Sequence, residues 1–429
     1  MESFKFIAPL FDTITVLSCL LGAIILNLLT RFPQFRKFKE FKQLLFAKNS
    51  HSATKNTISP LQAMFTAMST SLGMGTIVAP PLAIAIGGPG ALFWIMIYAL
   101  FACVTKYTEA TFAVKYKRYA PDGTIIGGPT GYLYQIHPRL ADWYGLLIIF
   151  LLLSWTALQS KSLAAAYAYY SVPEYATGFV IACFTLFMLI RGIKSIAELS
   201  TGLVPLHFIA YFALCCFIIF SDLHLLLQAF ISIFTHAFSS TAAVGGFVGS
   251  TVLTSIRQGT FKAAFVTEAG IGTAAIPHAL ADNKIPTNQG ILAMYSTIGD
   301  VFCCILSGLV TLITGVWKLG HISNDLPLLA FKSKLPTLGP IAYVAVVTLF
   351  AIGTIIGNSL NASKNFAFFT NNRYLFVYYI LIATCIFCGA VFHTATLWQL
   401  ADFIMPLIVL PHVTGLIILT LKHKDELKA

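Results

Sequence analysis

Charged residues are scarce in this chain. Asp, Glu, Lys and Arg together make up 10% of the 429 residues, whereas soluble domains carry roughly a quarter of such residues. Hydrophobic residues make up 57%, and the mean hydropathy is +0.81. A chain with so few polar side chains cannot cover a water-facing surface, so the composition excludes an ordinary soluble domain and indicates a membrane protein.

The chain also lacks the motifs of the common enzyme classes. It contains no HExxH, no GxSxG and no nucleotide-binding motif, which are the patterns that carry metal, acyl-transfer and phosphate chemistry. Its nine cysteines show neither CxxC spacing nor the Cys/His spacing of a metal site. We therefore predict that the protein is not an enzyme, that it has no cofactor, and that any transport draws on an ion or solute gradient.

Long apolar segments are what the sequence has in abundance. A transmembrane helix needs about 20 apolar residues, and we count eleven candidate segments with no soluble domain between them. The sequence thus predicts an all-α polytopic membrane protein, one membrane domain over residues 1–429 with about eleven spans. The segments are residues 8–30, 58–86, 89–112, 144–170, 176–190, 202–220, 238–280, 290–315, 338–360, 375–395 and 399–421.

Positive charge gathers on alternate connections between these segments. With the N-terminus outside, the cytoplasmic connections and the C-terminal tail hold 19 of the 27 Lys and Arg residues. This distribution follows the positive-inside rule. It therefore predicts a cell (inner) membrane protein with its N-terminus outside and its C-terminus in the cytoplasm. Because topology accounts for the positive charge, we predict no nucleic-acid partner. The basic segment 31–46 is interpreted either as a topology anchor or as an amphipathic helix on the anionic inner leaflet.

Two glycine-containing interruptions are the most informative feature of the apolar segments. Residues 69–81 read STSLGMGTIVAPP, and residues 267–277 read TEAGIGTAAIP. Backbone that leaves the helix loses hydrogen-bond partners that hydrocarbon does not replace, so a break is tolerated where it faces protein, water or a ligand. Paired breaks in two halves of a membrane chain indicate the midplane substrate site of a secondary transporter.

The positions of the two breaks suggest an internal repeat. With segment 8–30 set aside as an extra N-terminal span, the breaks fall in the first and sixth of the ten remaining spans. We therefore predict a 5+5 repeat with boundaries at about 58–220 and about 238–421. Because five is odd, the second repeat has to be inverted in the membrane.

The first break has two interpretations. Glycine lets a ligand approach the backbone closely, and a helix that restarts near Pro81 would direct its amide-rich N-terminus back at Gly73 and Gly75. Such a helix end suits a carboxylate. The other interpretation is close helix packing through small residues.

Ionisable residues lie inside the apolar segments. Glu268, in the second break, is interpreted either as a gate, a coupling residue or a clamp on the free amides of the break, or as a carboxylate that caps the half-helix after Gly270. The i,i+3 spacing of Lys106 and Glu109 favours a local ion pair over a gate contact. Asp300 lies deep in the eighth span, where bonding to the broken backbone and a role in coupling both stay open.

Several stretches together resemble the alanine or glycine:cation symporter family (the sodium:alanine symporters), in order from about residue 30 to 360. The resemblance implies a leucine-transporter-like fold with an extra N-terminal span. It also implies symport of alanine or glycine, sometimes in D form, usually with sodium. The stretches are residues 61–116, GGPTGYL (127–133), RQGTFKAAFVTEAGIGTAAIPHA (257–279), QGILAMYSTIGDVF (289–302) and LFAIGTIIGN (349–358).

The resemblance also implies site residues, position by position. Backbone amides at the first break would hold the substrate carboxylate, and backbone carbonyls of Ser69 and Leu72 with the hydroxyl of Thr354 would hold sodium. We take Lys161, Glu268 and Asp300 as candidates for coupling or gating. The substrate-binding set is Gly73, Gly75, Thr76, Gln159, Phe265, Thr267, Gly270 and Gly272.

The chain departs from the family pattern at four places. The family usually has Asn at the position of Thr76, Ser-Asn at Val266-Thr267, two serines at Gly353-Thr354 and Asn at Lys161. Sodium prefers oxygen ligands, so these losses weaken the case for it. Because a buried Lys can substitute for a bound cation, Lys161 supports a proton-coupled or cation-independent carrier. The plainer interpretation is that Lys161 snorkels or pairs with Glu268 or Asp300.

These observations together predict a secondary active transporter. We expect sodium-coupled symport of a small neutral amino acid, alanine or glycine in L or D form, by alternating access in a monomer. The alternative is a proton-coupled or cation-independent amino-acid carrier with Lys161 in place of the cation. A channel, a membrane sensor or a membrane enzyme is less favoured.

Overall fold

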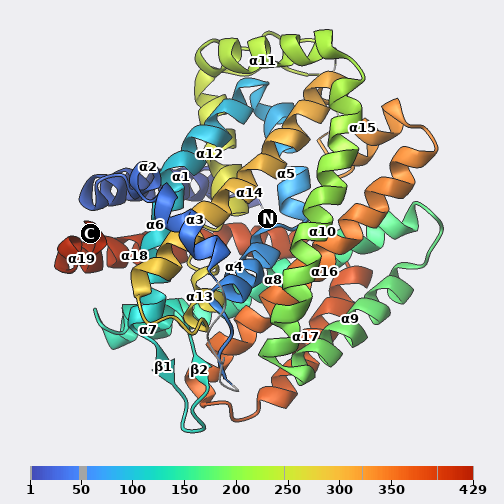
Figure 1. Ribbon diagram of the computed structural model, residues 1–429. Helices are drawn as coiled ribbons and strands as arrows, with labels where there is room; N and C mark the ends of the chain where they lie inside the picture. The colour runs from blue at the N-terminus through green and yellow to red at the C-terminus, as the bar shows by residue number, and fades with distance from the viewer. Residues whose placement is uncertain (1, 48–55, 246, 321, 394, 429) are drawn as a thin grey trace.

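The computed structural model describes residues 2–47, 56–245, 247–320, 322–393 and 395–428. Over these residues the chain is a bundle of helices with one antiparallel hairpin, β1 (Arg118–Tyr119) and β2 (Ile125–Ile126) (Figure 1). The helices are α1 (Glu2–Thr30), α2 (Pro33–Arg36), α3 (Phe38–Phe46), α4 (Pro60–Ser71), α5 (Met74–Gly87), α6 (Gly90–Lys115), α7 (Pro129–Leu133), α8 (Pro138–Ala168), α9 (Glu174–Arg191), α10 (Ile193–Phe220), α11 (Leu223–Phe238), α12 (Val252–Thr267), α13 (Ala275–Ala279), α14 (Pro286–Thr314), the 3-10 helix η1 (Val316–Leu319), α15 (Leu326–Lys334), α16 (Leu338–Thr370), α17 (Leu375–Val391), α18 (Ala395–Lys422) and α19 (Lys424–Lys428).

The helices match the predicted spans closely. Eight helices of the described residues are long and apolar enough to cross a membrane, and the bent pair α4 and α5 makes a ninth span. These correspond to nine of the eleven predicted segments. The other two contain α12 with α13, which the second break separates, and the shorter apolar helix α17. The predicted class, an all-α polytopic membrane protein, is confirmed.

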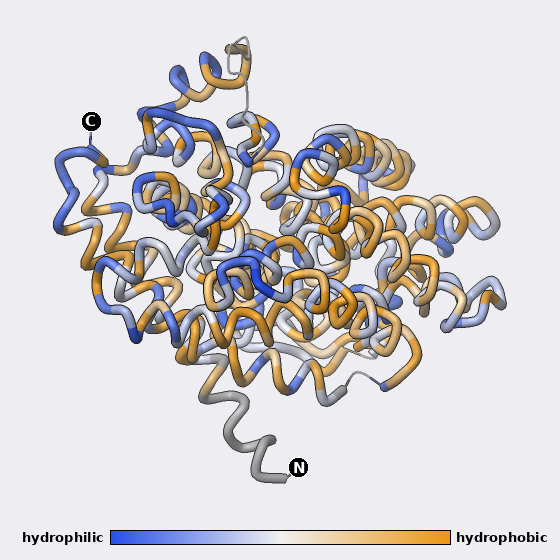
Figure 2. Tube along the Cα trace, turned by 90° about the horizontal axis from the view of Figure 1, so that it is seen from below, coloured by the Kyte–Doolittle hydropathy of each residue, from blue (hydrophilic) through white to orange (hydrophobic). Residues whose placement is uncertain are grey.

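The outer surface of the bundle is apolar. On α9, for example, Phe179 is 61% and Val180 67% exposed. Figure 2 shows hydrophobic residues along most of the trace, while a hydrophilic stretch lies beside the C-terminus. So much exposed apolar surface is unfavourable in water but is covered in a bilayer.

Helix α11 was not predicted, because it falls in the connection between two predicted spans. Its start is capped by Asp222, whose side chain accepts the backbone N–H of Leu225 at 3.1 Å. In Figure 1 it lies across the top of the bundle, and it packs on α6. There the indole N–H of Trp94 donates to the carbonyl of Ala237 at 3.1 Å.

The basic segment 31–46 forms the short helices α2 and α3. The ring of Phe41 stacks on Tyr295 of α14, with 4.6 Å between centroids, while Lys39 and Lys42 are exposed. The segment is therefore helical, as one interpretation required. Its contact with a lipid leaflet stays a prediction.

The two broken helices are joined at the end of the bundle where the β-hairpin lies. Ile58, just before α4, donates its N–H to the carbonyl of Leu280 at 3.1 Å, and the N–H of Asp282 donates back to Ile58 at 2.8 Å. Lys117, beside the hairpin, donates to the carbonyl of Ala281 at 2.5 Å. These bonds close this end of the bundle, which is the cytoplasmic end in the predicted topology.

Candidate functional site

The first break lies between α4 and α5. A capping box of Ser59 and Gln62 starts α4, which ends at Ser71. The chain then leaves the helix at Gly73, whose N–H donates to the carbonyl of Ser71 at 2.9 Å. It resumes as α5 at Met74, bent by 44° from α4.

The expectation that the helix restarts near Pro81 is wrong, because α5 already begins at Met74 and contains Pro80 and Pro81. A proline inside a helix leaves the carbonyl four residues earlier without its N–H donor. The carbonyl of Ile77, freed in this way by Pro81, accepts the hydroxyl of Ser307 from α14 at 2.5 Å. The neighbouring helix thus supplies the bond that the proline removes.

The N-terminus of α5 faces polar side chains of other helices. The N–H of Met74 donates to the side-chain oxygen of Gln159, on α8, at 3.2 Å. A Cβ atom added at Gly73 would lie 2.5 Å from the Thr354 hydroxyl, and one added at Gly75 would lie 2.8 Å from the Phe265 ring. Both positions therefore require glycine for these close approaches.

A cavity of about 120 Å³ lies between the two breaks. A water molecule needs about 10–15 Å³ of such space, so the cavity has room for a small organic solute. Trp155 and Trp398 pack against Phe265 at 5.1 and 6.2 Å between ring centroids and form an aromatic wall. The lining also reaches Asn324, which comes just before α15, and Asp402, near the start of α18. Figure 1 shows α15 away from the β-hairpin, so the cavity extends away from the end that the hairpin closes.

The predicted cation ligands converge beside this cavity. The hydroxyl of Thr354 lies 3.2 Å from the carbonyl oxygen of Ser69 and 3.3 Å from that of Leu72. The hydroxyl of Ser69 is buried and has no hydrogen-bond partner among the described residues. A Cβ added at Gly353 would lie 2.8 Å from it, so this hydroxyl faces α16, the helix of Thr354. Oxygen atoms gathered in this way fit a hard cation.

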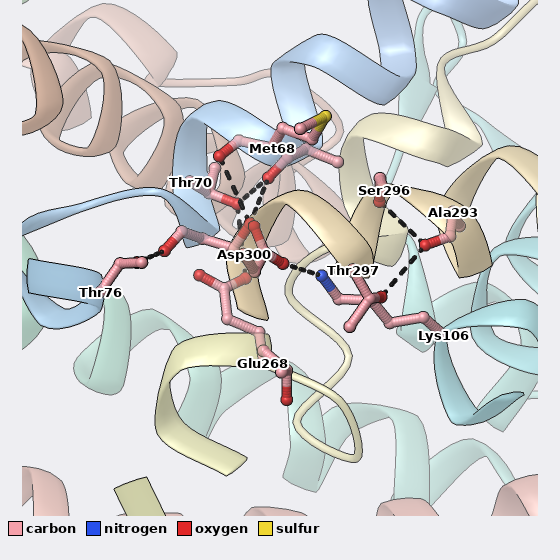
Figure 3. Close-up of polar contacts among 12 residues, drawn as sticks. Met68, Thr70, Thr76, Lys106, Glu268, Ala293, Ser296, Thr297 and Asp300 are labelled. Carbon is pink, nitrogen blue, oxygen red and sulfur yellow. Dashed lines mark hydrogen bonds and ion pairs between the residues drawn. The ribbon is translucent and has the colours of Figure 1, made fainter. Parts of the chain in front are cut away.

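The structure brings together half of the predicted substrate-binding residues. Gly73, Gly75, Gln159 and Phe265 line the cavity. Four others lie outside the lining. The hydroxyl of Thr76 donates to Ser71 at 2.9 Å (Figure 3), and that of Thr267 donates to Ala263 at 2.8 Å, so both are engaged locally. The remaining two are Gly270 and Gly272.

Gly270 and Gly272 shape the second break, where side chains of other helices form hydrogen bonds with the backbone. Both have positive φ angles, 89° and 90°, which favour glycine. The carbonyl of Gly270 accepts from His412 at 2.8 Å, and that of Ile271 accepts from Tyr144 at 2.8 Å. Because side chains occupy these backbone groups, the second break offers few free polar atoms to a ligand. The other side-chain donors to the break are Tyr98, to Ala269, and Asn361, to Thr273.

Glu268 is the residue of the second break that lines the cavity. It takes the left-handed conformation at the end of α12, with φ 55°. Its carboxylate accepts from the hydroxyls of Thr273 and Thr70. The expected half-helix directly after Gly270 does not form, because α13 begins only at Ala275 and its N-cap Ala274 has no side-chain cap. The N–H of Gly270 donates to Glu109 at 2.8 Å instead.

The predicted local pair of Lys106 with Glu109 is also wrong. Lys106 donates to Asp300 on α14 at 3.0 Å, and both side chains are almost fully buried (Figure 3). The other carboxylate oxygen of Asp300 accepts from Ser71 at 2.9 Å. Asp300 therefore bonds a side chain at the end of the first half-helix and not the broken backbone itself; its role in coupling stays a prediction. The sequence showed that this charge was buried but not which helix faced it.

Lys161 lies outside the cavity lining. Its ammonium pairs with Glu174 at 2.7 Å and donates to the carbonyl of Ala390 at 3.1 Å. The lysine thus does pair with a carboxylate, but with neither Glu268 nor Asp300. Its side chain is 24% exposed, so it does not replace a bound cation beside Thr354.

A bundle of apolar helices with two breaks around a small central cavity defines an integral-membrane transporter. Comparison with known proteins narrows this class. The model of the sodium:alanine symporter family matches residues 3–429, and the chain belongs to that family.

Individual relatives agree with this assignment. The sodium/alanine symporter AgcS of Methanococcus maripaludis is 30% identical over 433 residues, covering 96% of this chain and 93% of that protein. The amino-acid carrier protein AlsT of Bacillus subtilis is 26% identical, covering 88% and 81%. A solved manganese transporter of Eremococcus coleocola superposes with a TM-score of 0.53 at 13% identity, covering 89% of this chain and 80% of that one, and so shares the fold.

Proposed function

We propose that this protein is a sodium-coupled symporter of a small neutral amino acid, alanine or glycine. One observation carries the proposal: the N-terminus of α5 and the oxygens of Ser69, Leu72 and Thr354 meet at the edge of one small cavity. A helix N-terminus carries about half a positive charge and suits a carboxylate. The oxygens suit the cation that accompanies it.

The substrate would lie with its carboxylate at Gly73 and Gly75. Gln159 now accepts the N–H of Met74 at 3.2 Å, so its side chain would share this helix end with the substrate or move aside. The aromatic wall of Phe265, Trp155 and Trp398 would enclose the substrate side chain. The choice of alanine or glycine follows the sodium/alanine symporter among the relatives, and the lining sets no preference between L and D forms.

Sodium would be a second substrate. Its ligands would be the carbonyls of Ser69 and Leu72 and the hydroxyl of Thr354, with the free hydroxyl of Ser69 as a further oxygen. The site would adjoin Gly73, because a Cβ there would touch the Thr354 hydroxyl. A cation bound beside the substrate carboxylate raises the affinity for the substrate, and by linkage the bound substrate raises the affinity for the cation.

Alternating access would move the repeats, residues 58–220 and 238–421, around the cavity, with the span 8–30 as an addition. The cavity extends away from the closed end, which supports an outward-facing arrangement if the N-terminus lies outside. We propose a monomer in the cell (inner) membrane with its C-terminus in the cytoplasm.

The alternative, a carrier in which Lys161 replaces the cation, has no support from geometry. The lysine is paired with Glu174 outside the cavity lining. The position of Lys161 does not bear on proton coupling through other groups.

Uptake of labelled alanine and glycine into proteoliposomes tests the proposal, with sodium and proton gradients varied independently. We expect saturable uptake that an inward sodium gradient drives and that persists when the proton gradient is collapsed. Uptake that is equal in sodium and choline would overturn sodium coupling. Counterflow exchange separates a carrier from a channel.

A further inference from the structure

Glu109 and His412 hold both backbone polar atoms of one residue in the second break. Glu109 accepts the N–H of Gly270 at 2.8 Å through Oε1, and Nδ1 of His412 lies 2.8 Å from the carbonyl oxygen of Gly270. The two side chains approach within 3.9 Å of each other. They are 1% and 0% exposed, and neither lines the substrate cavity.

The hydrogen bonds fix the proton positions on the imidazole. A carbonyl oxygen only accepts, so Nδ1 of His412 carries a proton. Nε2 lies 2.5 Å from the hydroxyl of Tyr132 and accepts from it when the ring is neutral. A neutral His412 leaves the Glu109 carboxylate without a cation, and its Oε2 atom is buried without a hydrogen-bond partner among the described residues.

The charge of Lys106 acts on Glu109, but this ammonium is already paired with Asp300 at 3.0 Å. The phenols and the thiol around the pair are uncharged near neutral pH. A buried carboxylate in these surroundings is costly, and one added proton on Glu109 removes its charge. The ionisable groups that face the pair are Lys106 and Tyr98 on α6, Tyr132 on α7, Tyr144 on α8, Cys19 on α1 and Glu268 in the break.

We propose that Glu109 and His412 form a proton-binding site that exchanges with the cytoplasm, distinct from the sodium ligands and from Lys161. The position of the pair supports this. Glu109 lies in the last two turns of α6, and Tyr132 belongs to α7, next to the β-hairpin at the closed end of the bundle. Opening of that end, which the proposed alternating access requires, would expose the pair to cytoplasmic water.

Proton binding would then bias the transport cycle. The protonated pair is compatible with burial and stabilises the closed arrangement, whereas the deprotonated carboxylate is better solvated when the cytoplasmic end is open. Return to the outward-facing state therefore requires a proton from the cytoplasm. On the alkaline side of the titration the protonated fraction falls about tenfold for each pH unit, and the uptake rate falls with it.

The experiment measures initial alanine uptake into proteoliposomes of uniform orientation at fixed external pH, while internal pH is varied. We expect uptake to slow several-fold as the internal pH rises. Glu109→Gln keeps an acceptor for the Gly270 N–H but does not titrate, so it should flatten this dependence. Glu198→Gln, at an exposed position of α10, is the matched control and should keep it. Wild-type uptake that ignores internal pH, or a Glu109→Gln variant with the wild-type profile, would overturn the proposal.

A measurement without transport separates this proposal from the proposed function. Infrared difference spectra of the purified protein in lipid, taken in acidic and alkaline buffer, report protonated carboxyl groups. A band that Glu109→Gln removes supports the site even if alanine is not transported; a spectrum that the substitution leaves unchanged contradicts it. If Glu109→Gln does not fold, His412→Gln, which keeps a donor for Gly270, should shift the midpoint of this band. A midpoint equal to the wild-type value overturns the pairing.

Discussion

The hydroxyl of Ser307 donates to the carbonyl of Ile77, the acceptor that Pro81 leaves without a backbone donor. The bond joins α14 to the second half of the first broken helix. It lets a proline lie in an apolar helix without a buried, unpaired carbonyl, which would be costly in a membrane. The position of the substrate-facing end of α5 thus depends on a side chain more than two hundred residues away in the sequence.

Replacing this hydroxyl should lower stability. Ser307→Ala leaves the Ile77 carbonyl unpaired, and we expect a loss of about 1–3 kcal/mol, seen as a lower unfolding midpoint in detergent. Ser333→Ala, at an exposed position of α15, is the control and should have little effect. Equal midpoints for the two variants would show that the Ile77 carbonyl finds another partner.

Removing the Thr354 hydroxyl should weaken the response to sodium. Thr354→Val keeps the shape but deletes one of the converging oxygens, and we expect the sodium concentration for half-maximal uptake to rise about tenfold, the equivalent of 1.4 kcal/mol. The control is Thr370→Val at the far end of α16, whose hydroxyl donates only to Phe366 among the described residues. A sodium response unchanged by Thr354→Val would place the cation elsewhere.

The sequence predicted the helices and the place of the first break well. Hydropathy and glycine positions suffice for this, because in lipid the backbone N–H and C=O groups have to form their hydrogen bonds within each span. The restart near Pro81 was wrong, since the rule that proline ends a helix ignores a donor such as Ser307 on another helix. Helix α11 was missed for a related reason: its position follows from packing on α6 and not from a membrane-spanning length.

Ion pairs were predicted less well than helices. Spacing along α6 favoured a bond between Lys106 and Glu109, but the helices facing α6 supply Asp300 and the Gly270 N–H instead. Sequence alone does not give the rotation of one helix against another. The sequence indicated only that Glu109, a carboxylate in an apolar span, needed a partner. It did not indicate that the partner would come from another helix.

The pair of Lys106 and Asp300 can be tested by removing first one charge and then both. Lys106→Met leaves the buried carboxylate of Asp300 without its cation, and we expect a loss of about 3–5 kcal/mol. The double variant Lys106→Met with Asp300→Leu removes both charges and should recover much of that loss. Thermal unfolding of the single and double variants in detergent measures the difference. A double variant no more stable than Lys106→Met would mean that Asp300 is needed chiefly by Ser71.

Gly75 gives the sharpest test of the substrate site. A Cβ at this position would lie 2.8 Å from the ring of Phe265, at the N-terminus of α5. Gly75→Leu should therefore abolish alanine binding and uptake while the protein still inserts and folds. The matched control is Gly202→Leu on α10, where nothing lies within 4 Å of an added Cβ.

A second pair of variants shows whether the contact with Phe265 is the cause. Gly75→Ala alone should reduce uptake, because the ring has to shift by several tenths of an ångström. Combining it with Phe265→Leu frees the space and should restore part of the uptake. The two changes are in contact, so their effects should not add. Full activity of Gly75→Leu, with expression equal to that of the wild type, would show that the substrate carboxylate does not approach this end of α5.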